Sequence, residues 1–455
     1  MYRLSTWSHC FFRENVAALY HALTMEVVYL PRASGEAILH GGRDVCSLDI
    51  WSEEVGEALP YLIEKRFLVA PDNHDYSELE SQRVALAANQ PLDVMYLLVT
   101  DGCNLRCTYC FEESPGAPKF RARQMDESTV DAAIDTFARL TGQYGSVNPE
   151  KLIQLYGGEP LMNKKAIRRA VRRLAERKES GDLSSETKLV ILTNGLLLDE
   201  EFAQYLATEK VALGISLDGP ALYTNTYRIA KKKGVDTFVG ARRAYEIARA
   251  AGIEVGLSAT LTPDVVAHFD EVLDFFINDL RVESGINFNI LHFSPAAPVD
   301  DEYYDRAADC ILLAFERFRD LGIYEERMMR KVQSFADQDP IFVDCGVSGN
   351  QIIVAPDGAI GVCQDFVKPR TYFHGSVHDK GDPIASGLHA EWRTRSPFYI
   401  DGCQSCPAIA ICGGGCPASV ELSTGNRWNI DRRICPHSRK SLEWLIWETY
   451  ATTVV

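Results

Sequence analysis

Three cysteines in the stretch GCNLRCTYCFE are the residues of this chain whose spacing most clearly indicates chemistry. Three residues separate Cys103 from Cys107, and two separate Cys107 from Cys110. Three thiolates are one ligand short of a tetrahedral zinc site, and they also leave one iron of a 4Fe-4S cube without a protein ligand. An iron with an open position can bind a substrate or cofactor, whereas zinc with a distant fourth ligand would be structural. The spacing alone leaves both alternatives open.

A second set of seven cysteines follows near the end of the chain. Twelve residues separate Cys345 from Gly358, and four separate Gly358 from Cys363. The other members are Cys403, Cys406, Cys412, Cys416 and Cys435. The N-terminus lacks the basic start and apolar core of a secretory signal, so we expect a cytoplasmic protein in which thiols at short spacings are metal ligands or catalytic groups rather than disulfides. A zinc ribbon built from CQSC and CGGGC is the structural alternative.

Polar motifs follow several strand-like runs at the point where each run ends. GGEP covers residues 157–160, TNG covers 193–195, and SLDG covers 216–219. The carboxyl ends of parallel strands meet at one rim of a barrel, where active sites are built. We therefore expect the cysteine loop and these motifs to surround a single site.

The elements that must position this site alternate regularly along the middle of the chain. Six apolar runs are separated by amphipathic helical windows, such as 126–140 with Asp126 as N-cap, which predicts an α/β fold with a parallel sheet. The expected strands are 93–100, 151–156, 188–194, 211–217, 253–260 and 285–291. Six units rather than eight indicate a partial (β/α)6 barrel.

Two further modules are expected at the ends of the chain. Residues 1–88 contain short strand-like runs at 8–12, 17–23 and 25–31 and a helical window at 52–67, which together resemble a winged-helix module. The barrel is assigned to 89–325 and a cysteine-rich domain to 326–455, with a closing helix over 439–453 that packs its large apolar residues into a core.

The cysteine loop and its flanking strand resemble the radical S-adenosylmethionine (SAM) enzymes, in which an aromatic residue, here Tyr109, precedes the last cysteine. The resemblance implies a 4Fe-4S cluster on Cys103, Cys107 and Cys110, and SAM bound to its open iron. It also implies that the backbone and glutamate of the GGEP motif hold the amino group of the methionine moiety. The cofactor-binding residues implied in this way are Tyr109, Gly157, Gly158, Glu159, Pro160, Asn194, Ser216, Asp218 and Arg228.

The seven later cysteines are similar, interval for interval, to the SPASM domain, which holds two auxiliary 4Fe-4S clusters. The resemblance assigns Cys345, Cys363 and Cys416 to the first auxiliary cluster. It assigns four others to the second, namely Cys403, Cys406, Cys412 and Cys435. Because seven thiolates cannot fill eight positions, the first cluster lacks one cysteine ligand, and a substrate thiolate or backbone group is a candidate for that position.

The three unassigned cysteines, Cys10, Cys46 and Cys310, are interpreted as small buried hydrophobic residues. Asp365, two residues after Cys363, is a candidate base that takes a proton from the substrate radical. Sulfatase-maturating relatives have an aspartate directly after the corresponding cysteine, where this chain has Gln364. A solvated or capping aspartate is therefore the alternative for Asp365.

The composition and net charge limit the classes of partner that we expect for this protein. The chain is 46% hydrophobic with a net charge of −16, which is typical of a globular protein and unfavourable for general nucleic-acid binding. No apolar run is long enough to cross a membrane. The resemblance implies a flavodoxin- or ferredoxin-type electron donor and a precursor peptide, whose leader a winged-helix-like element would capture by strand addition.

The function expected from these observations is that of a radical SAM peptide maturase, which oxidatively crosslinks a precursor peptide through a thioether, carbon–carbon or carbon–oxygen bond. A sulfatase maturase that forms formylglycine is the second enzymatic alternative. A non-catalytic iron-sulfur electron carrier or zinc scaffold is the alternative from another class, and it leaves the GGEP and TNG motifs at one rim unexplained.

Overall fold

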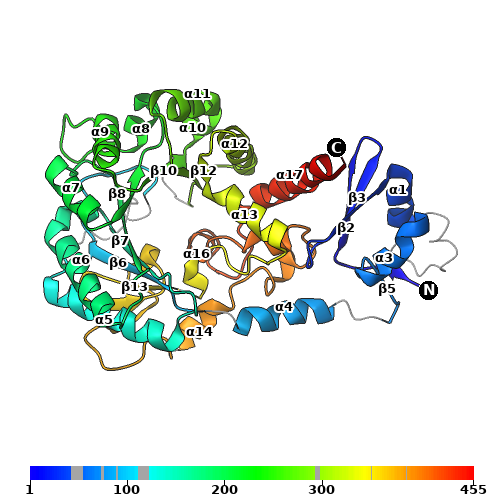
Figure 1. The fold of residues 1–455 in the computed structure, drawn as a ribbon, viewed down its shortest axis with the longest axis horizontal. Helices are drawn as coiled ribbons and strands as arrows, with labels where there is room; N and C mark the ends of the chain where they lie inside the picture. The colour runs from blue at the N-terminus through cyan, green and yellow to red at the C-terminus, as the bar shows by residue number, and fades with distance from the viewer. Residues whose placement is uncertain are drawn as a thin grey trace.

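The computed structural model describes residues 1–41, 55–72, 76–88, 91–110, 122–292, 298–349, 351–385 and 387–454. Figure 1 shows an N-terminal module on the right, a large α/β part on the left, and the C-terminal region between them. Among the described residues, no helix combines the length and the apolar character needed to span a bilayer.

A ten-stranded sheet forms the centre of the α/β part. Strands β6 to β12 are parallel and lie side by side in chain order, and a further parallel strand, β13, pairs with β6. The parallel strands are β6 (Val94–Thr100), β7 (Leu152–Gly157), β8 (Lys188–Thr193), β9 (Ala212–Ser216), β10 (Val255–Leu261), β11 (Gly285–Ile290), β12 (Tyr324–Glu325) and β13 (Gln351–Val354). The α/β fold and all six predicted strands are confirmed, because β6 to β11 coincide with them.

Helices cover the outer face of this sheet (Figure 1), and polar caps fix where they begin. The Asp126 carboxylate accepts the Thr129 N–H at 2.8 Å, which confirms the predicted cap, and Asp199 caps its helix in the same way. The helices are α5 (Glu127–Tyr144), α6 (Lys164–Glu179), α7 (Glu200–Thr208), α8 (Ala221–Tyr227), α9 (Thr237–Ala250), α10 (Pro263–Ala267), α11 (Phe269–Asp274) and α12 (Asp301–Arg319). The strand-to-helix loops therefore gather at one rim of the sheet.

The strand β13 extends the sheet beyond the predicted barrel. It pairs with β6 from Gln351 opposite Val94 to Val354 opposite Leu97, and antiparallel with β14 (Ala359–Gly361), which in turn pairs with β15 (Phe373–Ser376). The sheet thus continues across residue 325, while the domain boundaries themselves stay a prediction. This pairing places the cysteine-rich region beside the strand from which the first cysteine loop starts.

The N-terminal module contains the three expected strands as an antiparallel sheet. They are β2 (Ser8–Arg13), β3 (Val16–His21) and β4 (Val27–Pro31), and α1 (Arg32–Gly41) follows them without having been predicted. The expected helix at 52–67 begins outside the described residues and continues as η1 (Gly56–Ala58) and α3 (Leu59–Glu64). A two-stranded pair, β1 (Arg3–Leu4) with β5 (Leu68–Val69), precedes α4 (Tyr76–Ala88).

The C-terminal region connects the other two parts. Its main helices are α13 (Glu326–Asp337), α14 (Gly387–Arg393), α15 (Ile409–Cys412), α16 (Pro417–Thr424) and α17 (Cys435–Val454), and its one-turn segments are η5 (Gly346–Ser348), η6 (Gln364–Phe366) and η7 (Asp401–Cys403). The α/β part has two such short segments, η3 (Pro160–Asn163) and η4 (Phe275–Asp279). Leu442, Ile446 and Trp447 of α17 share a core with Trp7 and Tyr20 of the N-terminal module. The predicted closing helix is confirmed, and it anchors that module.

Candidate active site and cysteine groups

The loop of residues 103–110, here called the rim loop, follows β6 and is held by the segment after α8. The Arg106 N–H donates to the Ile229 carbonyl at 2.8 Å, and the Thr108 N–H donates to the Tyr227 carbonyl at 3.0 Å. Leu105 and Ala230 form an isolated antiparallel bridge. These bonds fix the backbone that carries Cys103, Cys107 and Cys110 before any metal is bound.

The glycines of GGEP lie directly against the start of the rim loop. Gly157 has a φ of +134°, and a Cβ built on it would lie 1.9 Å from the Thr100 carbonyl oxygen. A Cβ on Gly158 would lie 2.4 Å from the carbonyl oxygen of Gly102. Any side chain at these two positions would displace the strand end, so the sequence GG is required for the two loops to approach each other.

Glu159 ties two strand ends together. Its carboxylate accepts the Thr193 hydroxyl at 2.6 Å and the Asn194 N–H at 2.8 Å, and it is 1% exposed. Burial raises its pKa above the ordinary value. Glu159 thus positions the TNG motif, and its predicted contact with the methionine amino group stays a prediction.

Asn194 reaches from β8 to the rim loop. Its amide donates to the Oδ1 atom of Asn104 at 2.7 Å, while its own Oδ1 accepts the Leu196 N–H at 3.1 Å. Sequence reasoning missed Asn104, although it lies between two of the cysteines. This bond links the TNG motif to the cysteine loop.

A buried ion pair supports the aromatic residue of the rim loop. The Arg228 guanidinium binds both carboxylate oxygens of Asp218, at 2.8 and 2.9 Å, and the Tyr109 hydroxyl donates to the same carboxylate at 2.7 Å. Asp218 also accepts the Thr260 N–H at 2.8 Å. The structure therefore brings Tyr109, Asp218 and Arg228 into direct contact. Because Arg228 binds both oxygens of Asp218, each buried charge has a partner that offsets the cost of its burial.

Two other predicted residues lie at the same rim with fewer contacts. Pro160 is buried at the first position of η3, and Ser216 ends β9 opposite Ser258 of β10. Eight of the nine predicted cofactor-binding residues thus lie at or after the ends of β6 to β9, and Arg228 follows helix α8; that they bind a cofactor stays a prediction.

Three of the later cysteines meet in one apolar cluster. Cys363 is buried there with Phe366 and Trp392, and Cys345 and Cys416 pack against it. Burial raises the pKa of Cys363, and the neighbouring charges of Cys416 and Cys345 raise it further. We call Cys345, Cys363 and Cys416 the first cysteine group.

The other four cysteines form a separate cluster, the second cysteine group (Cys403, Cys406, Cys412 and Cys435). The pKa of Cys435 is raised to about 12, first by burial and then by the charges of the other three cysteines of this group. Cations surround this group: Arg439 is hydrogen bonded to Cys406, and the buried Lys331 lies beside Cys412. The structure therefore separates the seven cysteines into the two predicted sets.

An acid and a histidine lie against the first cysteine group. The ligand atoms of His292, Asp365 and Cys416 all lie within 4.8 Å of one another. The Asp365 side chain is 2% exposed, and burial raises its pKa to about 7, while the charge of Arg433 lowers it. His292 follows the end of β11, so the rule that polar residues gather after strand ends could have identified it.

Arg433 joins this group to the barrel. Its guanidinium binds the Asp431 carboxylate at 2.7 and 2.9 Å and the Leu291 carbonyl at 3.0 Å. Asp431 in turn accepts the Cys416 N–H at 2.9 Å. The pair was missed from the sequence, where D431 and R433 look like ordinary charged residues before a cysteine.

The two described unassigned cysteines fill apolar cores, as predicted. Cys310 is 7% exposed in the barrel core, and Cys10 packs against the core of the N-terminal module. Cys46 lies outside the described residues.

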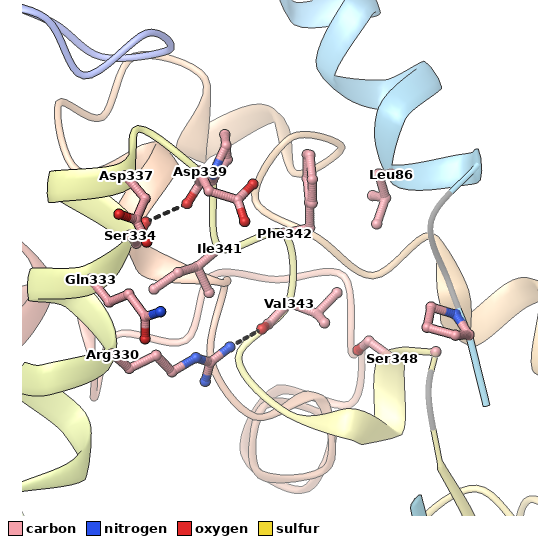
Figure 2. Close-up of a pocket in the computed structure, with 13 residues that line it drawn as sticks. Leu86, Arg330, Gln333, Ser334, Asp337, Asp339, Ile341, Phe342, Val343 and Ser348 are labelled. Atoms are coloured by element: carbon pink, nitrogen blue, oxygen red, sulfur yellow. Dashed lines mark hydrogen bonds between the residues drawn. The ribbon is translucent and has the colours of Figure 1, made fainter. Parts of the chain in front are cut away.

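Two cavities lie in the C-terminal region, and another, of about 490 Å³, lies at the rim against Arg106 and Arg228. One of about 390 Å³ lies between Leu86 of α4 and α13; Figure 2 shows Arg330 bound to the Val343 carbonyl and Ser334 bound to the Asp339 carbonyl across its wall. None of the predicted site residues lines this cavity within the described ranges. A second cavity, of about 850 Å³, is lined by Asp431 and Arg433 and by Gly402, which precedes Cys403.

Comparison with known proteins identifies the domain that carries the rim. Residues 97–276 match the Radical SAM superfamily. The chain is 24% identical to the Radical SAM cyclopropyl synthase TigE of Paramaledivibacter caminithermalis, over 84% of this chain and 81% of that protein. It is 23% identical to a cysteine-type anaerobic sulfatase-maturating enzyme of Clostridium perfringens, over 72% of this chain and 89% of that protein.

Among solved structures, the chain is similar to Streptococcus suis SuiB bound to its precursor peptide SuiA. The TM-score is 0.54 with 15% identity, and the match covers 96% of this chain and 100% of that chain. The similarity shows a shared fold.

Proposed function

Residues 97–276 form a radical SAM domain, and from this premise we propose that the protein is a peptide maturase that oxidatively crosslinks a ribosomally made precursor. The observation that carries the proposal is the convergence of the rim loop, the GGEP backbone and the Tyr109–Asp218–Arg228 network at one end of the parallel strands. When bound, a 4Fe-4S cluster and SAM supply a 5′-deoxyadenosyl radical that abstracts hydrogen from an unreactive C–H bond.

The chain's own residues fit such a cofactor pair. Cys103, Cys107 and Cys110 would hold the cluster and leave one iron for SAM. The close backbone approach at Gly157 and Gly158, where the Gly158 and Glu159 N–H groups donate to the Thr100 and Gly102 carbonyls at 3.1 and 2.9 Å, holds the GGEP motif against the start of the rim loop.

The network around Asp218 positions the rim loop and takes no part in the reaction itself. Because Asp218 is fully buried and holds both Arg228 and the Tyr109 hydroxyl, it fixes the residue that precedes Cys110 in the loop. Asn194 and Ser216, at neighbouring strand ends, would border the same bound SAM. A rigid rim excludes water and stray hydrogen donors from the radical.

The two cysteine groups fit two auxiliary 4Fe-4S clusters, so that the protein would carry three clusters in all. Zinc does not account for them, because one tetrahedral site uses four thiolates and leaves the buried first group without a role. An auxiliary cluster is a chemically suitable acceptor for the electron that an oxidative crosslink releases. A flavodoxin- or ferredoxin-type protein would supply the electron that starts the reaction.

A peptide substrate is supported by the relatives and by the N-terminal module. TigE is a cyclopropyl synthase, and SuiB has been solved with a precursor peptide. In the described residues β2 and β4 each pair on one side only, so the module offers sheet edges to which a leader peptide could add a strand. The winged-helix-like assignment of residues 1–88 is part of this proposal.

A sulfatase maturase is the second candidate, because the match to the C. perfringens enzyme covers most of both chains. The two candidates differ in substrate: a short precursor peptide in one, and a cysteine or serine of a sulfatase in the other.

Mass spectrometry after anaerobic co-expression with a short peptide encoded beside the gene tests the proposal. We expect the peptide to lose two hydrogens, and the Cys107→Ala variant to leave it unchanged and to form no 5′-deoxyadenosine. If the reconstituted protein cleaves SAM and converts a sulfatase-derived peptide but never the neighbouring one, the crosslinking proposal is wrong and the sulfatase candidate replaces it.

A further inference from the structure

The first cysteine group offers three thiols where a 4Fe-4S cube has four irons. Of the other cysteines in the described part of the chain, those outside both groups lie in apolar cores of the barrel and the N-terminal module. The second cysteine group already supplies four thiols of its own. Within the described residues, a fourth protein ligand for the first group would therefore come from another residue type.

Asp365 is the residue beside the first cysteine group that best fits the role of a fourth ligand. It belongs to the one-turn segment η6, which begins directly after its N-cap residue Cys363. Its carboxylate is the largest charged influence that raises the pKa of Cys363 and of Cys416, and it acts on Cys345 as well. The Asp365 carboxylate and the Cys416 thiol lie within 4.8 Å of each other, which places the acid at the edge of this group.

The carboxylate also has an unused oxygen. Among the described residues, Oδ1 of Asp365 has no hydrogen-bond partner, although the side chain is only 2% exposed. A buried carboxylate oxygen without a partner is costly, and coordination to a metal ion removes that cost. The nearest cation cannot serve as the partner, because Arg433 is engaged by Asp431 and the Leu291 carbonyl.

We propose that the Asp365 carboxylate is the fourth protein ligand of the first auxiliary cluster. The inference rests on the proposed function, since it needs a cluster in the first cysteine group. His292, whose Nδ1 atom lies 3.8 Å from Asp365, is a neighbour of this ligand; its side chain is 42% exposed, against 2% for the acid.

The proposal changes two expectations drawn from the sequence. The first auxiliary cluster is closed by the protein rather than open to a substrate thiolate. Asp365 is an iron ligand rather than the free base that takes a proton from the substrate radical.

The test uses the full chain with Cys103, Cys107 and Cys110 changed to alanine, so that only auxiliary clusters give a signal. Into this background go Asp365→Ala, Asp365→Cys, His292→Ala and the control Asp344→Asn, which alters an acid that neighbours Cys345 but is paired with Arg330 at 3.3 Å. Iron content, Mössbauer and EPR spectra, and the reduction potential are measured for each.

We expect Asp365→Ala to lose about one iron per chain on oxidation and to show the EPR signal of a 3Fe-4S cluster. Asp365→Cys should keep four irons in that cluster and lower its reduction potential, because a thiolate donates more charge to iron than a carboxylate does. His292→Ala and Asp344→Asn should match the parent.

The proposal is overturned if both Asp365 variants match the parent in spectrum and potential, or if His292→Ala alone yields the 3Fe-4S signal. A separate Cys363→Ser variant checks the premise. If it loses no iron, no cluster occupies the first cysteine group, and the cofactor assignment under the proposed function fails rather than the ligand assignment alone.

Discussion

The two cysteine groups lie in the same region of the molecule but in opposite electrostatic surroundings. The second group has four thiols with Lys331 and Arg439 among their neighbours. The first has three thiols, a buried acid at Asp365, and an arginine whose charge is already paired with Asp431. Cations that face a set of thiolates compensate the charge a cluster would bring, whereas an added carboxylate does not.

This difference indicates two kinds of site. Four thiols with compensating cations form a complete, closed centre suited to holding structure or passing electrons. Three thiols with a carboxylate would give a bound cluster one chemically distinct iron, and the neighbouring Asp431–Arg433 pair lines a cavity of about 850 Å³. The cysteine pattern predicts which cysteines belong to each group, and the charged residues around each group distinguish one from the other.

Removing one thiol from each group should give the largest effects. We expect Cys403→Ser and Cys363→Ser each to lose about four irons per chain, since each breaks one cluster. Cys403→Ser should also lower the unfolding temperature more, because Ile409 and Ile411 beside the second group share a core with the N-terminal module. Iron analysis and calorimetry measure both. Loss of all auxiliary iron from either single variant would contradict the separation into two groups.

Arg433→Met tests the link between the first group and the barrel. It leaves the Asp431 carboxylate buried without its partner, which should lower the free energy of unfolding by about 4 kcal/mol. Arg432→Met, at the exposed neighbouring position, is the control and should change little. Anaerobic denaturant unfolding gives the comparison. Equal losses in the two variants would show that the buried pair does not hold the first group in place.

Glu325→Gln supplies a change in the barrel away from both groups. Burial raises the pKa of Glu325 from 4.5 to about 7, so wild-type stability should fall as pH rises through this window and the buried acid ionises. The glutamine keeps an oxygen that can accept the Met328 N–H, now 2.7 Å from the carboxylate. Well above the window the variant should be more stable by about 3 kcal/mol.

Unfolding curves across pH measure this difference, and Glu326→Gln at the exposed neighbouring position is the control. A stability advantage of Glu325→Gln that stays constant at every pH would contradict the ionisation argument. Loss of iron from either cysteine group in this variant would show that the groups and the barrel are not independent.

Lys331→Met should have the smallest effect and is specific to the second group. Lys331 is buried and donates to the Ile411 carbonyl at 2.7 Å, beside Cys412. Removing its charge should lower the reduction potential of the second cluster by on the order of 50 mV and leave the first unchanged. Lys440→Met on α17, where the lysine pairs with Asp305 and Asp309, is the control. A redox titration followed by EPR decides, and equal shifts in both clusters would contradict the assignment of Lys331.

Sequence patterns within short segments predicted the strands, the helix caps and the strand-end motifs, because these depend on interactions between residues close in the chain. Alternating apolar runs gave β6 to β11, and the caps and strand-end motifs placed Glu159, Asn194 and Asp218 at one rim. Pairings between distant segments could not be predicted in this way. The β13–β6 pairing joins residues far apart in the chain, and the meeting of His292 with Asp365 depends on it and on Arg433. Helix α4 was missed because it buries only Leu79 and Leu86.

An anomalous difference map at the iron edge, from crystals grown anaerobically, tests the central claim most directly. We expect anomalous density for iron at the rim loop and at both cysteine groups, and the density at the first cysteine group should contact the Asp365 carboxylate. Zinc-edge signal at the second group, with no iron at the first, would contradict it.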